Sequence, residues 1–445
     1  MADLHFRAAL LPQGWTDNVR LTLRAGLIAT IETDTPPRPT DDRHAIGLPG
    51  TTNLHSHAFQ RAMAGLTETR GPQADSFWTW REQMYRFALT MSPDDAEAIA
   101  AQAYLEMLES GFTTVAEFHY LHHAPDGRAY DNPAEMAARI AAAADQTGIG
   151  LTLLPVFYAH GGFGARPTEP AQRRFVTTPD SYATLFDRCR PLPARLGTAP
   201  HFLRAATPAE ITTLAGLHDG PIHIHVAEQQ REVADCLAAT GQRPIEHLFA
   251  HTEIDRRWCL IHATHANPAE VAAIARSGAT VGLCPLTEAN LGDGIMPAAS
   301  LAQAGGRYGV GTDSNIRISL PDELATLEYG QRLATQARNV MSPAASTGAA
   351  LFHAALTGGA QAAGLPRHGL QPGAQADIVS LDARHPALIG RTGNTILDSW
   401  IFAARPGLID RVWSAGTEVV THGTHHQTAA ITARYRTTME RLLRQ

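Results

Sequence analysis

Residues 46–57 read IGLPGTTNLHSH, an apolar run that ends in two histidines separated by one residue, His55 and His57. If this run is a strand, the spacing points both imidazoles to the same side of its carboxyl end. Two neighbouring imidazoles pack poorly by themselves, whereas a divalent metal ion binds both through neutral nitrogens. Such a pair is also compatible with surface or hydrogen-bonded histidines, so a metal site needs further ligands from elsewhere in the chain.

The sequence that follows this run indicates the fold class. From about Leu48 to about Gly364, short apolar runs alternate with Ala-rich segments of helical pattern, such as residues 92–111, 132–148 and 267–278. Repeated alternation of strand and helix predicts an α/β domain with a parallel sheet. The length of the region favours a (β/α)8 barrel, whose active site lies at the carboxyl ends of the strands.

The two ends of the chain have a different pattern of apolar residues. Residues 4–46 and the region after about His368 contain short, punctuated apolar runs typical of β-strands, and the final stretch has a helical pattern. We therefore expect a small β-sandwich built from both chain ends. The expected bounds are 1–47 for its first part, 48–366 for the catalytic barrel, and 367–445 for its second part with a C-terminal helix.

Composition excludes several classes of protein. The 445 residues carry a formal net charge of -7, which argues against a nucleic-acid or anionic-membrane partner. The four cysteines have no paired spacing, so neither a disulfide framework nor a cysteine zinc site is predicted. No apolar run reaches the roughly 18 residues of a membrane span. We expect a cytoplasmic protein.

Three later strands supply further polar groups at their ends. His225 lies near the end of GPIHIHVAEQQ (220–230) and Glu228 follows it by three residues. His262 ends the apolar run in CLIHATHAN, and Asp313 ends the run in GVGTDSN. The expected mononuclear metal site therefore has the ligands His55, His57, His225 and Asp313.

Neighbouring polar residues have simpler interpretations. His223 lies deeper in the same strand as His225 and is expected to be a core histidine, and His265 is expected to line a loop outside the site. Glu228 could be a surface residue at the start of a helix, where a carboxylate favours the helix dipole. We favour a catalytic role because it lies one turn past a predicted ligand at the mouth of the barrel.

The order of these motifs carries a resemblance. An HxH after a strand, an HxxE, a later histidine and a TDS aspartate resemble the amidohydrolase superfamily, and the match spans nearly the whole chain. The segments HSHAFQRAMAG, WREQMYRF, AEFHYLHH, APHFLRA and HVAEQQREV more closely resemble the formimidoylglutamate deiminases of histidine degradation. This resemblance implies hydrolysis of N-formimidoyl-L-glutamate to N-formyl-L-glutamate and ammonia, one divalent ion per subunit, expected to be zinc, and a homodimer.

The chain contains no lysine, and all 36 basic residues other than histidine are arginine. Superfamily members with two bridged metals, such as dihydroorotase, hydantoinase and urease, resemble one another in using a carboxylated lysine, which this chain lacks. Glu117 could in principle supply a bridging carboxylate instead. The HxxE motif, however, is typical of the one-metal deaminases.

The expected chemistry follows from the metal and the groups beside it. Zinc lowers the pKa of a bound water toward neutrality and so supplies a hydroxide. Glu228 would hold the imine nitrogen and deliver a proton to it, which makes ammonia the better leaving group. The resemblance places His262 and Asp313 beside the water as candidates to take its proton. The sequence leaves the division of acid and base roles among these three residues open.

The resemblance also implies a set of substrate-binding residues, and their chemistry suits an acidic substrate. Arginine binds carboxylates bidentately, so two arginines with a histidine and a glutamine could hold a glutamate moiety. Arg61 and Arg70 are expected to be structural or loop residues. The expected substrate-binding residues are Gln60, Arg81, Tyr120, His201 and Arg204.

Two alternatives remain open from the sequence. The first is another one-metal deaminase or hydrolase of the same superfamily that acts on guanine, cytosine, an adenosine-type ring or a triazine. Such a protein should have apolar and amide side chains where this chain has Arg81 and Arg204. The second is a catalytically silent, metal-binding barrel protein.

Overall fold

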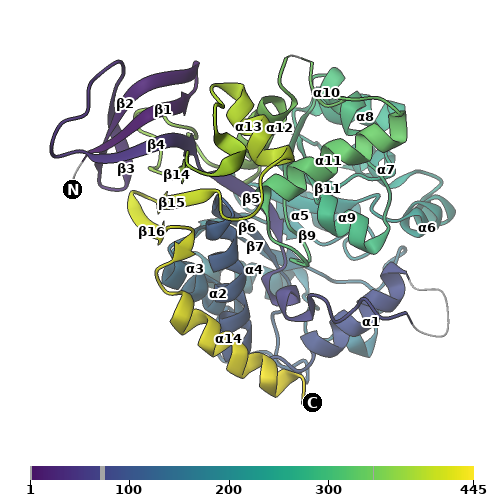
Figure 1. Ribbon diagram of the computed structural model, residues 1–445. Helices are drawn as coiled ribbons and strands as arrows, with labels where there is room; N and C mark the ends of the chain where they lie inside the picture. Colours follow the sequence, from purple (N-terminus) through teal and green to yellow (C-terminus); the bar gives the residue numbers. More distant parts are fainter. Residues whose placement is uncertain (1–2, 71–75, 344, 445) are drawn as a thin grey trace.

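The computed structural model describes residues 3–70, 76–343 and 345–444 (Figure 1). Parallel strands occupy the middle of the molecule, helices cover them, and a separate sheet lies to one side. The first parallel sheet contains β5 (Thr51–Ser56), β6 (Phe112–His119), β7 (Gly150–Phe157) and β8 (Arg195–Leu196), with β9 (Ala199–Pro200) paired to β7. The second contains β10 (Ile222–Val226), β11 (Trp258–His262), β12 (Thr280–Leu283) and β13 (Arg307–Val310).

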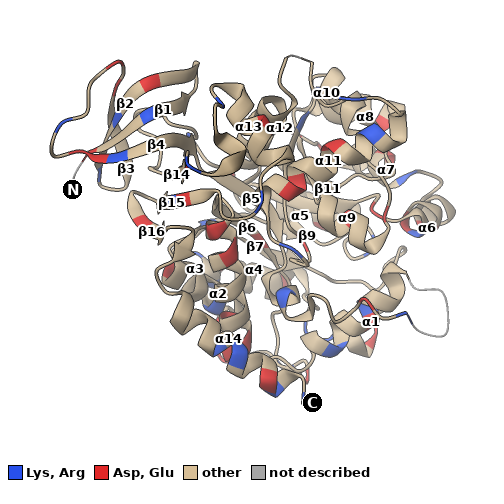
Figure 2. Ribbon diagram, viewed as in Figure 1, with Lys and Arg blue, Asp and Glu red and all other residues tan. Residues whose placement is uncertain are grey.

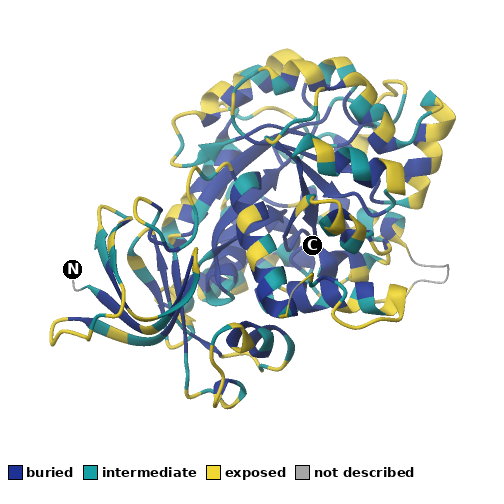
Figure 3. Cartoon of the chain, turned by 90° about the horizontal axis from the view of Figure 1, so that it is seen from above, coloured by how far each residue is buried: buried dark blue, intermediate teal, exposed yellow. Residues whose placement is uncertain are grey.

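Two parallel bridges connect these sheets. Ser56, at the end of β5, bridges to Asp313 beyond β13, and Thr198 beside β9 bridges to Ile222 of β10. The strands are buried and the helices around them expose their outer faces (Figure 3). The carboxyl ends of strands from both sheets therefore face one common region, as the α/β prediction requires.

Helices connect the parallel strands, and those expected from the Ala-rich segments are confirmed. The first of them begins after Ser92, whose hydroxyl accepts the backbone N–H of Asp95. None of the described helices is long and apolar enough to cross a bilayer. The helices of this region are α1 (Phe77–Ala88), α2 (Pro93–Glu109), α3 (Glu135–Thr147), α4 (Pro179–Cys189), α5 (Pro208–Ala215), α6 (Gln230–Thr240), α7 (Pro244–His251), α8 (Pro268–Ser277), α9 (Pro285–Leu291), α10 (Ala298–Gln303), α11 (Leu320–Thr335) and α12 (Thr347–Ala362).

The two chain ends share one sheet of eight strands, in the order β17-β16-β15-β14-β4-β1-β2-β3. The structure thus joins the chain ends as expected, but in a single hydrogen-bonded sheet. Its strands are β1 (Leu4–Leu11), β2 (Gly14–Arg24), β3 (Leu27–Glu32), β4 (Asp42–Pro49), β14 (Ile378–Leu381), β15 (Ile409–Ser414), β16 (Thr417–Thr421) and β17 (Thr424–His425), and α13 (Asn394–Phe402) lies between β14 and β15 in the chain.

The run 46–57, expected to form one strand, is divided between the two parts of the molecule. β4 pairs with β1 and β14 of the terminal sheet, whereas β5 pairs with β6. The division falls at Gly50, whose N–H donates to the carbonyl oxygen of Asp377 at 2.9 Å. A side chain at Gly50 would meet Thr113 of β6, with its Cβ 2.9 Å from the Thr113 Cβ, so the close approach of this residue to β6 requires glycine.

The C-terminal helix α14 (Thr428–Leu442), predicted from its pattern, packs on α2. Arg434 pairs with Glu97 of α2 at 2.5 Å, and Arg441 pairs with Asp95. Arg139 of α3 also pairs with Glu97, at 3.0 Å. Acidic and basic residues are accordingly interspersed over these outer helices (Figure 2).

Replacing Gly358 of α12 by alanine is expected to lower the free energy of unfolding by about 1–3 kcal/mol, which is the usual cost of overpacking. The added Cβ would collide with the carbonyl group of Tyr308 in β13, which is backbone and cannot rotate away. The loss should exceed the gain from alanine's higher helix propensity. Urea denaturation measures the change.

Gly216→Ala is the matched control, because this exposed residue at the end of α5 has only ordinary contacts, at 3.5 Å or more, around an added Cβ. Equal stability of the two variants would show that α12 does not depend on this close approach to β13.

Candidate active site

Four predicted metal ligands converge at the carboxyl ends of the parallel strands. His55 lies in β5, His57 follows it, His225 lies in β10, and Asp313 follows β13. The His55 and His225 Nε2 atoms are 3.1 Å apart, and Asp313 Oδ1 is 3.3 Å from His57 Nε2 and 3.5 Å from His55 Nε2. One ligand atom from each of the four residues lies within 4.8 Å of all the others, and all four residues are buried.

The imidazoles are oriented by the backbone behind them. His57 Nδ1 faces the carbonyl oxygen of Phe118 at 2.9 Å, and His225 Nδ1 faces that of His201 at 2.9 Å. A carbonyl only accepts, so each Nδ1 carries the hydrogen and each Nε2 presents its lone pair to the centre of the group. Burial lowers the pKa of His55 to about 3. Three neutral imidazoles and one carboxylate are a donor set that fits a divalent ion.

One other group of described residues could hold a metal ion: His262, Cys284 and Asp313, also within 4.8 Å of one another. It shares Asp313 with the first group and offers fewer ligands. Glu117, considered as a bridging carboxylate, is in neither group. Its Oε1 instead accepts the backbone N–H of Ala58 at 2.7 Å, next to His57.

The loops that carry the ligands are tied together. The N–H groups of Thr312 and Asp313 both donate to the carbonyl oxygen of His55, at 3.1 and 2.9 Å. The side-chain amide of Asn315 donates to the carbonyl oxygens of His57 and Asp313, both at 3.1 Å. Asp313 itself has a φ of 45°, and this left-handed backbone directs its carboxylate to the histidines. Asn315 was not predicted from the sequence.

Glu228 and His262 lie beside the four-ligand group. His262 Nε2 is 3.8 Å from Glu228 Oε1 and 3.7 Å from Asp313 Oδ2. His262 Nδ1 faces Glu288 Oε1 at 3.2 Å, so Glu288 fixes the orientation of this ring. The backbone N–H of Glu228 donates to Glu232 at 3.0 Å, which holds the loop before α6.

The surroundings of these two groups raise both pKa values above those of isolated side chains, for different reasons. Burial raises the pKa of Glu228 to about 7. Burial lowers the pKa of His262, but the carboxylates of Glu228, Glu288 and Asp313 outweigh it and raise the value to about 10. Glu228 is buried, so the interpretation as a surface helix residue is wrong.

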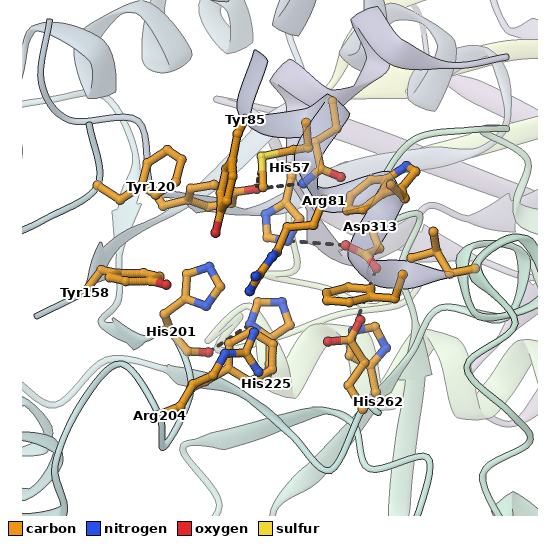
Figure 4. Close-up of a pocket in the computed structure, with 18 residues that line it drawn as sticks. His57, Arg81, Tyr85, Tyr120, Tyr158, His201, Arg204, His225, His262 and Asp313 are labelled. Atoms are coloured by element: carbon orange, nitrogen blue, oxygen red, sulfur yellow. Dashed lines mark hydrogen bonds and ion pairs between the residues drawn. The ribbon is translucent and has the colours of Figure 1, made fainter. Parts of the chain in front are cut away.

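All five predicted substrate-binding residues line the same cavity as three of the predicted metal ligands, His57, His225 and Asp313 (Figure 4). Gln60 donates from Nε2 to the Tyr120 hydroxyl at 2.7 Å, and its buried Oε1 has no partner among the described residues. The Nδ1 atom of His201 is likewise buried without a partner there. These atoms remain available to a bound molecule.

Arg81 of α1 and Arg204 lie on opposite sides of this cavity (Figure 4). The Arg81 guanidinium lies 4.6 Å from the ring centroid of Trp78, and that of Arg204 lies 3.6 Å from that of Phe202. Neither forms an ion pair within the described part of the chain, whose salt bridges involve other arginines. Aromatic rings thus support two cations that face the cavity and have no carboxylate among the described residues within ion-pair distance.

Several lining residues were missed by the sequence analysis. Phe77, Met84 and Tyr85 lie on the same helix as Arg81, at spacings that put them on one face, so helical periodicity could have identified them. Others come from separate segments and share no sequence pattern: Tyr158, Phe175 and Phe202 in loops, and Leu291 at the end of α9.

Residues assigned to the core or to loops behave as expected. His223 Nε2 contacts the carbonyl oxygen of Ala362 at 2.8 Å inside the protein. His265 is outside the set that lines the cavity. Arg61 is structural, because it donates to the carbonyl oxygens of Asn315 and Ile316.

Comparison with known proteins gives a consistent result. The model of the amidohydrolase family matches residues 46–419, and that of the N-terminal domain of formimidoylglutamate deiminase HutF matches residues 1–45. The chain is 50% identical over 434 residues to a formimidoylglutamate deiminase of Pseudomonas aeruginosa, covering 96% of each protein.

Two solved structures extend this comparison. An amidohydrolase from Brucella melitensis superposes with a TM-score of 0.97 at 51% identity and 100% coverage of both chains. An adenosine deaminase from Xanthomonas campestris with bound zinc gives a TM-score of 0.82 at 23% identity, covering 100% of this chain and 99% of the other. The second likeness shows a shared fold alone.

Proposed function

The chain belongs to the amidohydrolase family, and we propose that it hydrolyses N-formimidoyl-L-glutamate to N-formyl-L-glutamate and ammonia. The observation that carries this proposal is the cavity that joins a four-ligand metal group to two arginines without carboxylate partners. A flat neutral ring would leave both cations unneutralised, whereas a dicarboxylate neutralises them. The identity to a formimidoylglutamate deiminase over nearly the full chain supports the same substrate.

We propose that His55, His57, His225 and Asp313 hold one divalent ion, and that this ion is zinc. The fit rests on three imidazole nitrogens and one carboxylate oxygen that lie within 4.8 Å of one another, with the Nε2 lone pairs of His57 and His225 directed at this group. Such an ion, when bound, lowers the pKa of a water molecule and so supplies the nucleophile for hydrolysis.

Side chains of this protein then carry out the proton transfers. Glu228, with a pKa near neutrality, can hold the formimino nitrogen and pass a proton to it, so that ammonia leaves rather than an amide anion. Asp313 takes the proton from water, and His262, which its raised pKa keeps protonated, orients that carboxylate from 3.7 Å away. Glu288 holds the His262 ring so that its Nε2 atom faces Glu228 and Asp313.

Arg81→Met and Arg204→Met are each expected to raise KM for N-formimidoyl-L-glutamate by about 10- to 100-fold, because a hydrogen bond to a charged group contributes about 1.5–3 kcal/mol. Bound zinc should remain at one ion per chain, because neither arginine contacts a metal ligand. Steady-state kinetics with metal analysis measures both quantities.

The matched control for Arg81 is Arg86→Met, which removes an exposed guanidinium from the same helix. Wild-type kinetics for either pocket variant would contradict the role of that arginine.

We also propose that the two parallel sheets close into one (β/α)8 barrel, with domain bounds of 1–47, 48–366 and 367–445. The bridges at Ser56 and Thr198 support this closure, since they connect each free edge of one sheet to the other. A closed barrel brings the ends of β5, β10 and β11 to one face, which the proposed mechanism needs.

A further inference from the structure

Aromatic rings line the cavity at increasing distance from the predicted metal ligands. The ring centroids of His57 and Tyr120 are 5.0 Å apart, and those of His225 and His201 are 5.1 Å apart. Tyr158 lies one ring further out, 4.9 Å from His201. Tyr158 therefore belongs to a wall of the cavity that the metal ligands do not touch.

Tyr85 closes the same outer wall from the other side. Phe175 links the two tyrosines, with ring centroids 5.9 Å from Tyr85 and 6.0 Å from Tyr158. Arg81 lies one helical turn before Tyr85, and its guanidinium is 5.5 Å from the centroid of the Tyr85 ring. Figure 4 shows the Tyr85 hydroxyl directed into the cavity, between Tyr158 and Arg81.

The hydrogen of the Tyr158 hydroxyl is free to donate. Gln172 Oε1 accepts the backbone N–H of Glu169 at 2.7 Å, which fixes the orientation of this side-chain amide. Its Nε2 therefore donates to the Tyr158 hydroxyl, at 2.6 Å. A hydroxyl that accepts from an amide keeps its own hydrogen for another acceptor, and the described residues offer none.

The outer wall thus has an excess of donors. The Tyr85 hydroxyl forms no hydrogen bond with any described residue, and Arg81 and Arg204 form no ion pair with one. Burial raises the pKa of Tyr158, and the positive charges of Arg204 and Arg81 oppose that rise. All three side chains line the same cavity. Two hydroxyl donors and two guanidinium groups around one space match a carboxylate, which only accepts.

We infer that the hydroxyls of Tyr85 and Tyr158 bind the side-chain carboxylate of the substrate and thereby select for an acid of glutamate length. The inference rests on the proposed function. In N-formimidoyl-L-glutamate the α-carboxylate lies close to the reacting carbon, whereas the side-chain carboxylate extends furthest from it. With the formimino group at the metal ligands, only the side-chain carboxylate reaches the outer ring layer.

The test compares Tyr85→Phe and Tyr158→Phe with three substrates: the N-formimidoyl derivatives of L-glutamate, of L-norvaline, which lacks the side-chain carboxylate, and of 4-aminobutyrate, which lacks the α-carboxylate. Each variant is expected to raise KM about 10-fold for the glutamate and 4-aminobutyrate derivatives, as for a lost hydrogen bond to a charged group. The norvaline derivative should show no such penalty. The kcat for the glutamate derivative should change by less than about twofold, because neither hydroxyl faces the reacting atoms.

Tyr182→Phe is the matched control, because it removes a buried hydroxyl that lies outside the cavity and donates to the carbonyl oxygen of Pro155 in β7. An equal penalty with all three derivatives, a penalty only with the norvaline derivative, or no penalty would each overturn the inference.

Calorimetric binding separates this inference from the proposed function. If the wild-type protein released no ammonia from any of these derivatives, the proposed function would fail. The two variants should still weaken the binding of N-formyl-L-glutamate about 10-fold and leave that of N-formyl-L-norvaline unchanged. Unchanged binding of N-formyl-L-glutamate would refute the role of the two hydroxyls even in an active enzyme.

Discussion

His225→Ala is expected to remove the bound metal ion and to lower kcat/KM by about four orders of magnitude or more, because the pKa of water without an ion is about 15.7. The variant loses the Nε2 atom that lies 3.1 Å from His55 Nε2, and three ligands remain. Metal analysis of the purified protein and the rate of ammonia release measure the two effects.

His223→Gln is the control for this substitution. His223 lies on the same strand two residues earlier, and glutamine can still donate to the carbonyl oxygen of Ala362. This variant should retain one ion per chain. Full metal occupancy and activity in the His225 variant would contradict the proposed ligand set.

Glu228→Gln is expected to lower kcat by about 10²- to 10⁴-fold, the usual contribution of a positioned acid or base, with a small change in KM. Glutamine keeps the size of the side chain and can hold the formimino nitrogen, but it has no carboxyl proton to transfer. Zinc content should be unchanged, since Glu228 is not a member of the four-ligand group.

Glu270→Gln provides a buried carboxylate outside the cavity for comparison, because Glu270 pairs with Arg243 at 3.0 Å. It should leave kcat unaltered. A Glu228 variant with the kcat of the wild-type protein would exclude this residue from proton transfer.

The four-ligand group could be predicted because the position of each member depends on the strand that carries it. A strand fixes that His55 and His57 point the same way, and parallel strands bring their carboxyl ends to one face. His225 and Asp313 were therefore expected near that face before any distance was known. The structure brings these side chains within 4.8 Å of one another.

Other features depend on contacts between distant segments, which a single sequence does not reveal. Glu288 is identified only when α9 packs near β11 and turns its carboxylate to His262. Tyr158 and Tyr85 become neighbours only through Phe175, which comes from a third segment. The break at Gly50 was missed because the apolar pattern continues through it, although the two halves pair with different sheets.

The most direct test of the account is the rate of ammonia release by the zinc-loaded protein with N-formimidoyl-L-glutamate, measured beside guanine, cytosine and adenosine. The account predicts turnover of N-formimidoyl-L-glutamate alone, with N-formyl-L-glutamate formed in equal amount to ammonia. Ammonia release from one of the rings, with none from N-formimidoyl-L-glutamate, would contradict it.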